Sequence, residues 1–363
     1  MLPSIISRYI AGRFLFTILT IFLCCFLLVL LIDFVELIRR GGNKEQADTL
    51  SLFLMSLYRV PELTERILPF ATLFGSIAAF LNLSRRLELV IVRAAGMSAW
   101  QFLTPALFVA AALGIFAFAV YNPASAFLKD KSLEIDARIF GASFSSSGQT
   151  ASQGWVRQKG EDGDSILKAL TSYDNGRKLG GVTVFSYDQL GNFVERIDGK
   201  AAELEEGYWR LSDVLVTSAK SAPRHFETYL VSTHLTPQEA SETIANPESV
   251  PFWQLPHIID QAARSGLPAY KYRLQYQTLL ARPLLLAAMV LIAATVSLKV
   301  FRFGNVGKMI LSGVLAGFVL YVVTELAKDL GNTGLVNPIL SAWLPAIVAS
   351  LLGFSILLYQ EDG

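Results

Sequence analysis

Residues 14–32 read FLFTILTIFLCCFLLVLLI, and this run of 19 residues without a charge decides the class of the protein. A bilayer has a hydrocarbon core of ~30 Å, which an α-helix of ~20 apolar residues crosses. The run is too long for the apolar segment of a cleaved signal peptide, and no small-residue cleavage site follows it. It therefore predicts a retained transmembrane helix.

Five further apolar stretches follow along the chain. With the first, they predict six transmembrane helices in two sets of three, the others lying at 67–84, within 94–128, around 274–298, at 309–324 and within 330–360. Arg282 interrupts the fourth stretch, and the fifth has only 16 uncharged residues. Such a helix reaches roughly 24 Å, so flanking charged side chains are expected to extend towards the interface.

The middle of the chain differs from its ends in composition. The whole chain is 53% hydrophobic and 17% charged, against about 25% charged residues in an ordinary soluble domain, and the apolar excess lies at the two ends. Residues 122–270 instead alternate short β-rich runs with turn signals such as Asp162-Gly163 and Asn175-Gly176. Short strands separated by turns are typical of an all-β sandwich or barrel.

The resulting organisation is a membrane α-helical protein with an inserted all-β domain. We expect transmembrane helices 1–3 in residues 1–121, the β-domain in residues 122–270 with a closing helix at 247–266, and transmembrane helices 4–6 in residues 271–363.

Charged loops predict the orientation of these helices. With the amino terminus in the cytoplasm, loops 84–96 and 299–308 are cytoplasmic, and the second contains three cations and no acid. This pattern fits the positive-inside rule and places residues 122–270 outside. The first external segment is an exception, because it carries the cations Arg39, Arg40, Lys44, Arg59 and Arg66.

Several classes of function are disfavoured. A net charge of +1 gives no basic field for nucleic acid. Cys24 and Cys25 are adjacent in an apolar run and predict no disulfide framework. The three histidines are not at metal-ligand spacing, so we expect no metal, cofactor or catalytic centre; they are His225, His234 and His257. Gly307-Lys308 fails the phosphate-loop pattern, so ATP hydrolysis would need a separate protein.

The loop at residues 84–96, SRRLELVIVRAAG, predicts a short helix that ends at Gly96. Its apolar stripe consists of Leu87, Val90, Ile91 and Ala94. Such a helix suits a groove on a cytosolic partner, with Glu88 placed to pair with an arginine of that partner. The alternative is a plain interfacial helix whose charges only face water.

The motif Arg86-Leu87-Glu88-Leu89, followed by Arg93-Ala94-Ala95-Gly96, resembles the cytoplasmic loop of the LptF/LptG lipopolysaccharide-export permeases. The resemblance covers nearly the whole chain and is greatest to the LptG branch. Further matching segments are Arg8-Tyr9-Ile10, Phe34-Val35-Glu36-Leu37, Arg39-Arg40 and Pro69.

This resemblance implies a fold and a function. The chain is then a permease subunit of an ABC transporter in the bacterial inner membrane, with cytoplasmic termini and a periplasmic β-jellyroll. The complex would extract lipopolysaccharide and pass it to a periplasmic bridge. The implied partners are the paralogous permease LptF, a dimer of the ATPase LptB, and the bitopic protein LptC.

The resemblance also implies roles for individual residues. Glu88 would contact the ATPase within a coupling helix that includes Arg85, Arg86, Leu87, Arg93 and Gly96. Arg39 and Arg40 match basic positions of the family and would hold lipid A phosphates. Asp33, however, stands where the family often has a further basic residue.

Other positions are candidates from their place in the chain. Lys129 and Lys131 follow the third span, and Arg282 lies within the fourth, so all three are candidates for the same substrate cavity. The alternative for each cation is a juxtamembrane charge at the interface. Gly313 and Gly317 form a small-xxx-small pair suited to a gate between helices, or to routine packing.

Rival functions remain open at this stage. A non-transporting membrane scaffold or sensor that displays its β-domain needs no ATPase partner. An intramembrane protease is disfavoured, because the spans contain no His and no Asp motif to supply a base. An ABC permease of the four-span macrolide-exporter plan is disfavoured, because the large insertion here follows the third span.

Overall fold

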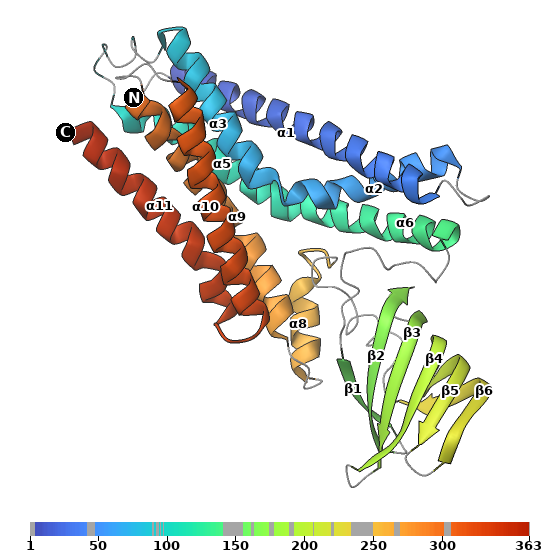
Figure 1. Cartoon of the computed structure of the whole chain (residues 1–363). Helices are drawn as coiled ribbons and strands as arrows, with labels where there is room; N and C mark the ends of the chain where they lie inside the picture. The colour runs from blue at the N-terminus through green and yellow to red at the C-terminus, as the bar shows by residue number, and fades with distance from the viewer. Residues whose placement is uncertain are drawn as a thin grey trace.

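A computed structural model of the chain separates a body of helices from a single β-sheet (Figure 1). It describes residues 4–41, 48–88, 91, 94, 96, 98–140, 155–160, 163–173, 178–188, 192–205, 207–218, 221–233, 250–264, 269–300 and 306–362.

The predicted transmembrane helices are present. Within these ranges, five helices are long and apolar enough to cross a membrane, and a bent pair brings the number to six. The helices of the first set are α1 (Ser4–Gly41), α2 (Thr49–Glu65), α3 (Leu68–Arg85), α5 (Ala99–Phe116), the π-helix η1 (Ala117–Tyr121) and α6 (Asn122–Phe140). Those of the second set are α9 (Tyr270–Val300), α10 (Val306–Asn332) and α11 (Pro338–Asp362), and the short helix α8 (Leu255–Arg264) precedes them.

The second span differs from the sequence expectation. α3 matches the predicted span, but α2 precedes it and the two helices are bent by 69°. Pro69 lies in the first turn of α3, where its missing N–H leaves no helical hydrogen bond unmade and its ring prevents the previous helix from continuing. The bend therefore has a local covalent cause.

Several helices extend beyond the thickness of a bilayer. α1 has 38 residues, which corresponds to roughly 57 Å against a hydrocarbon core of ~30 Å. α5, η1 and α6 follow one another without a break, so the third span continues as a helix to Phe140. α2 packs against both α1 and α6, forming a helical extension that the sequence did not predict.

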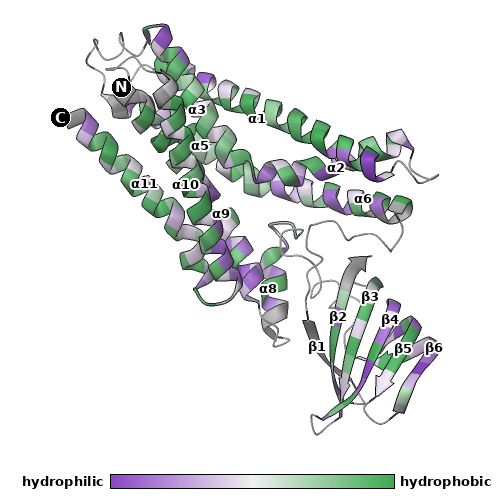
Figure 2. Cartoon of the chain, in the orientation of Figure 1, coloured by the Kyte–Doolittle hydropathy of each residue, from purple (hydrophilic) through white to green (hydrophobic). Residues whose placement is uncertain are grey.

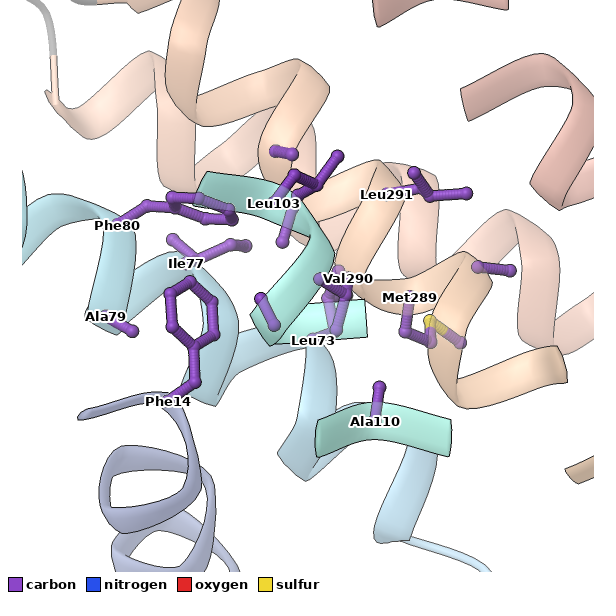
Figure 3. Close-up of a cluster of buried hydrophobic side chains, with 14 of the residues drawn as sticks. Phe14, Leu73, Ile77, Ala79, Phe80, Leu103, Ala110, Met289, Val290 and Leu291 are labelled. Atoms are coloured by element: carbon purple, nitrogen blue, oxygen red, sulfur yellow. The ribbon is translucent and has the colours of Figure 1, made fainter. Parts of the chain in front are cut away.

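The core of the helical body lies around α9, which packs against α3, α5, α10 and α11. One cluster of buried side chains joins these helices to the start of α1 (Figure 3). Phe14 of α1 meets Phe80 of α3 edge to face, with 4.8 Å between ring centroids. Such aromatic pairs contribute beyond their buried area, so α1 is anchored at this point.

Apolar side chains also cover the outside of the helical body. Only 6% of the most apolar window of Ile5–Gly41 is buried within the chain, and 17% of that of Ile310–Asn332. Figure 2 shows that hydrophobic residues run along most of α1. These faces suit lipid or the helices of other subunits.

Within the described residues, the inserted domain is a six-stranded antiparallel sheet, which confirms the all-β prediction. The strands are β1 (Trp155–Gly160), β2 (Gly163–Tyr173), β3 (Lys178–Tyr187), β4 (Phe193–Glu205), β5 (Tyr208–Ser218) and β6 (Ser221–Ser232). They pair in chain order, so the described strands form a meander. The jellyroll-like arrangement of the whole insertion stays a prediction, because residues 141–154 and 234–249 lie outside the described residues. The short links between consecutive strands explain the meander.

The sheet is apolar on one face, where the fully buried Trp209 and Leu211 pack with residues of the neighbouring strands. The predicted closing helix is α8, whose Leu255 and Ile258 pack with Tyr272 and Leu279 of α9. Gly266, its expected cap, lies outside the described residues. α8 thus attaches the end of the insertion to the second helix set.

Candidate coupling loop and cation sites

The candidate coupling loop begins with an abrupt change of direction after α3. The backbone N–H of Leu87 donates to the carbonyl of Ser84 at 2.8 Å, and the N–H of Ile91 donates to the carbonyl of Leu87 at 3.0 Å. Leu87 has a φ of 59°, a left-handed conformation that costs a non-glycine residue about 1–2 kcal/mol. Gly96 has a φ of 79°, which fits the predicted end of the loop helix.

The predicted apolar stripe of this loop is exposed. Leu87 and Ile91 are 61% and 65% exposed, and Ala94 is exposed as well. Arg85, Arg86 and Gly96 are also exposed, whereas Val90 and Arg93 lie outside the described residues. An uncovered apolar stripe beside exposed arginines has the composition of a docking surface.

Glu88 is held within the chain. Its side chain is half-buried, and Oε1 accepts a hydrogen bond from the hydroxyl of Tyr9 in α1 at 3.2 Å. Oε2 is buried, and no residue in the described part of the chain donates to it. Sequence reasoning missed Tyr9, although it lies in one of the segments that carry the family resemblance. The carboxylate therefore links the loop to α1 through Oε1, while Oε2 has no donor in the described part of the chain.

Arg39 and Arg40 lie in the last turn of α1, and both donate to the carboxylate of Glu36, at 3.0 and 2.8 Å. The side chain of Arg39 is 77% exposed. Exposed ion pairs of this kind contribute only ~0–1 kcal/mol, so both guanidinium groups remain able to bind an anion.

Lys129 and Lys131 lie on α6. Lys129 Nζ donates to Glu62 of α2 at 2.6 Å, and both side chains are largely buried. Lys131 Nζ lies 6.0 Å from the centre of the Phe127 ring. Asp33, the departure from the family pattern, faces Arg59 of α2 at 3.8 Å. Lys129 and Asp33 thus each face a residue of opposite charge on α2.

Arg282 lies in a different setting, within the helical body. It forms an ion pair with Glu65, the last residue of α2, and both side chains are largely buried. Asn122 and Ser125 donate to the same carboxylate, each at 3.0 Å. The five predicted substrate cations therefore occupy three separate places: the end of α1, α6, and this buried junction.

Gly313 and Gly317 allow α10 to approach α3 closely, as a small-xxx-small pair does. A methyl group on Gly313 would lie 2.6 Å from Ile77 Cδ1, and one on Gly317 would lie 2.2 Å from Leu73 Cδ2. The atoms they would meet are the ends of flexible side chains. Close helix contact is thus present, whereas the gating role stays a prediction.

The histidines behave as ordinary surface residues where they are described. His225 bonds Asp213 Oδ1 at 2.6 Å across β5 and β6, and His257 is exposed on α8. Lys200, and then His225, hold the pKa of the Asp213 carboxyl below its usual range. His234 lies outside the described residues. Within the described ranges, no three His, Cys, Asp or Glu side chains group in a way that would hold a metal ion.

Comparison with known proteins identifies the family of the chain. The family model described as lipopolysaccharide export system permease LptF/LptG matches residues 8–359. The chain is 24% identical to the lipopolysaccharide export system permease protein LptG of Escherichia coli strain K12 over 368 residues, covering 99% of each chain. It is 26% identical to the LptG of Haemophilus influenzae over 354 residues, covering 96% of this chain and 95% of that one. Because the family model spans nearly the whole chain, the protein belongs to the LptF/LptG family of lipopolysaccharide export permeases.

Proposed function

We propose that the chain is a permease subunit of an ABC transporter that extracts lipopolysaccharide from the inner membrane and passes it to a periplasmic bridge. The observation that carries the proposal is the family match over residues 8–359. The apolar helices and the family make the chain a multi-pass inner-membrane protein. The exposed stripe beside Glu88 gives such a permease a contact surface for an ATPase subunit.

The proposed assembly contains the paralogous permease LptF, two copies of the ATPase LptB, and the bitopic protein LptC. The relatives' shared LptG name supports the pairing with LptF. The sparsely buried faces of α1 and α10 offer surface for helices of LptF and LptC. The chain itself is not an enzyme in this proposal, and ATP hydrolysis by LptB supplies the energy.

The proposed orientation puts both termini and the Glu88 loop in the cytoplasm and the β-sheet in the periplasm. The basic loops at 84–96 and 299–308 support it. A reporter active only in the periplasm is expected to work when inserted at residue 190, between β3 and β4, and to be silent when fused to the carboxyl terminus. The reverse pattern would contradict the orientation.

Within this assembly, ATP-driven closure of LptB would press on the loop that contains Glu88, with Arg85, Arg86, Leu87, Arg93 and Gly96 completing the contact. The proposed cations for the anionic lipid are Arg39, Arg40, Lys129 and Lys131, whereas Arg282, a candidate from its place in the chain, is paired with Glu65. For Arg39 and Arg40 the support is their place in the last turn of α1 and the exposure of Arg39, since exposed cations just outside a span can bind anionic lipid headgroups. Gly313 and Gly317 would let α10 part from its neighbours as the lipid leaves.

The deciding experiment reconstitutes the purified chain with LptF, LptB and LptC in proteoliposomes loaded with lipopolysaccharide. We expect ATP-dependent release of lipopolysaccharide to a soluble periplasmic acceptor, and no release without this chain. An assembled complex that hydrolyses ATP without any release would favour the scaffold or sensor function instead.

The same assay tests the cations at the end of α1. Replacing Arg39 and Arg40 together by Ala is expected to lower release roughly tenfold or more, because each cation near an anionic surface contributes ~1 kcal/mol. Lys178→Ala, which removes an exposed cation of β3 paired with Glu203, is the matched control and should release normally. Equal release by both variants would remove Arg39 and Arg40 from the substrate site.

A further inference from the structure

Three irregularities of the helices meet at one place in the helical body. α2 ends at Glu65, where the 69° bend to α3 begins. The π-helix η1 ends immediately before Asn122. Arg282 directly precedes Pro283, the proline within α9. Prolines and π-helical turns interrupt the regular hydrogen bonding of a helix and are frequent at hinges and functional sites. One polar residue from each irregularity therefore lies at the junction.

Glu65 bonds to all of these partners at once. Its Oε1 pairs with Arg282 and accepts from Asn122 Nδ2 at 3.0 Å, and its Oε2 accepts from Ser125 Oγ at 3.0 Å. The Glu65 and Arg282 side chains are 7% and 15% exposed, and Asn122 and Ser125 are 2% exposed. A single carboxylate thus joins α2, α6 and α9.

A second layer of hydrogen bonds extends the junction to the end of the β-insertion. Asn122 Oδ1 accepts from the backbone N–H of Phe252 at 3.0 Å, and the indole of Trp253 donates to the carbonyl of Ala119 in η1 at 3.1 Å. The hydroxyls of Tyr121 and Thr64 lie 2.7 Å apart. The π-helix is therefore tied to α2 through the Tyr121 hydroxyl and to the segment before α8 through the Ala119 carbonyl.

The charges at this junction are not explained by stability alone. Removing two charges from water costs several kcal/mol per ion, and well-packed apolar residues of similar volume are often equally or more stabilising. An ion pair with satisfied hydrogen bonds has a defined geometry, so it fixes the helices in one relative position. An ionisable residue in such a place points to function.

α3 connects this junction to the coupling loop. It runs from Leu68, beside the bend, to Arg85, beside the loop, and its 18 residues span roughly 27 Å. It has no proline in its interior, since Pro69 lies in the first turn. α3 is therefore the continuous helix between the loop that contains Glu88 and the bend that follows Glu65.

We propose that Glu65 is a positioning residue for transport, which clamps the bend of α2 and α3, the end of η1, and α9 together through Arg282. The inference rests on the proposed function and deepens it, because it names the point where motion of the coupling loop passes from the first helix set to the second. Arg282 acts here as the clamp's cation.

The test separates this role from simple stabilisation. In Glu65→Leu with Arg282→Met, apolar groups replace the ion pair and the directional link is lost. Asn122 and Ser125 lose their acceptor in this variant, so we expect a modest loss of thermal stability, and assembly is checked before release is measured. We expect continued ATP hydrolysis with lipopolysaccharide released per ATP reduced about tenfold or more, within the factor of roughly 5–150 typical of coupling between sites. Glu325→Gln is the matched control, because the Glu325–Lys328 pair lies within α10 alone.

Each outcome decides the inference. Wild-type release per ATP in the double variant would overturn it. If the double variant does not assemble, lipopolysaccharide released per ATP is measured for Glu65→Gln, which keeps the side-chain volume. A wild-type value for Glu65→Gln would also overturn the inference. A wild-type complex that releases no lipopolysaccharide at all would contradict the proposed function itself, which is a different result from an uncoupled variant.

Discussion

Replacing Glu88 by Ala is expected to abolish lipopolysaccharide release while the chain still inserts and assembles. The loop that carries Glu88 presents an exposed apolar stripe, so docking of the ATPase would survive the change. The lost group is a carboxylate with one buried oxygen that has no donor among the described residues. Charge-assisted hydrogen bonds contribute ~1.5–3 kcal/mol, which corresponds to at least about a tenfold effect on each coupled step.

Two further variants show which contact of Glu88 matters. Tyr9→Phe removes the hydroxyl that donates to Oε1 but leaves the carboxylate in place. If Glu88 acts on the ATPase, Tyr9→Phe should keep most of the release, and if it acts through α1, the two variants should be equally defective. Glu227→Ala, which removes an exposed acid of β6, should behave as the wild type.

The measurement is release per ATP in proteoliposomes, with the amount of chain in the membrane determined in parallel. Normal lipopolysaccharide export by Glu88→Ala would end the coupling role of this loop. Loss of the chain from the membrane would show instead that Glu88 is needed for folding, and the Tyr9 contact would then be its main function.

The elements that follow local rules were predictable from the sequence. Long uncharged runs mark the transmembrane helices whatever their partners, because the bilayer sets the required length. Turn signals and short β-rich runs predicted that the insertion is built from antiparallel strands and turns. α2 was not predicted, since Arg59, Pro61 and Glu62 interrupt its apolar pattern and make it resemble a loop. The bend between α2 and α3 depends on Pro69, whose effect is local. The angle of the bend, however, is set by packing.

The candidate sites were predictable only in part, for a physical reason. The stripe of Leu87 and Ile91 follows helical periodicity, which is readable within a few residues. The partners of the charged residues are not local: Glu65 meets Asn122 across 57 positions and Arg282 across 217. Arg282 was conspicuous as a charge in an apolar run, but nothing in the sequence identified its carboxylate.

The second large effect is expected from Gly114→Ala in α5. A methyl group at this position would lie 2.4 Å from the Cα of Pro283 and 2.7 Å from its nitrogen. These are backbone atoms of α9, the central helix, and they cannot rotate aside. The two helices would have to separate, and overpacking of this kind typically costs ~1–3 kcal/mol. We therefore expect a clearly lower thermal unfolding temperature and less chain in the membrane.

Two other glycines make the comparison specific. Gly317→Ala meets only the end of the Leu73 side chain, which can move, so a small effect is expected. Gly12→Ala in α1 meets nothing within 4 Å, and Ala is a better helix former by ~1 kcal/mol, so its unfolding temperature should be unchanged or slightly raised. Thermal unfolding of the three purified variants in detergent gives the order of their unfolding temperatures. An unfolding temperature for Gly114→Ala equal to that of Gly12→Ala would mean that α5 and α9 do not meet closely at Pro283. The junction at the neighbouring Arg282 would then lose its rigid support, because the same contact holds α9 against the first helix set.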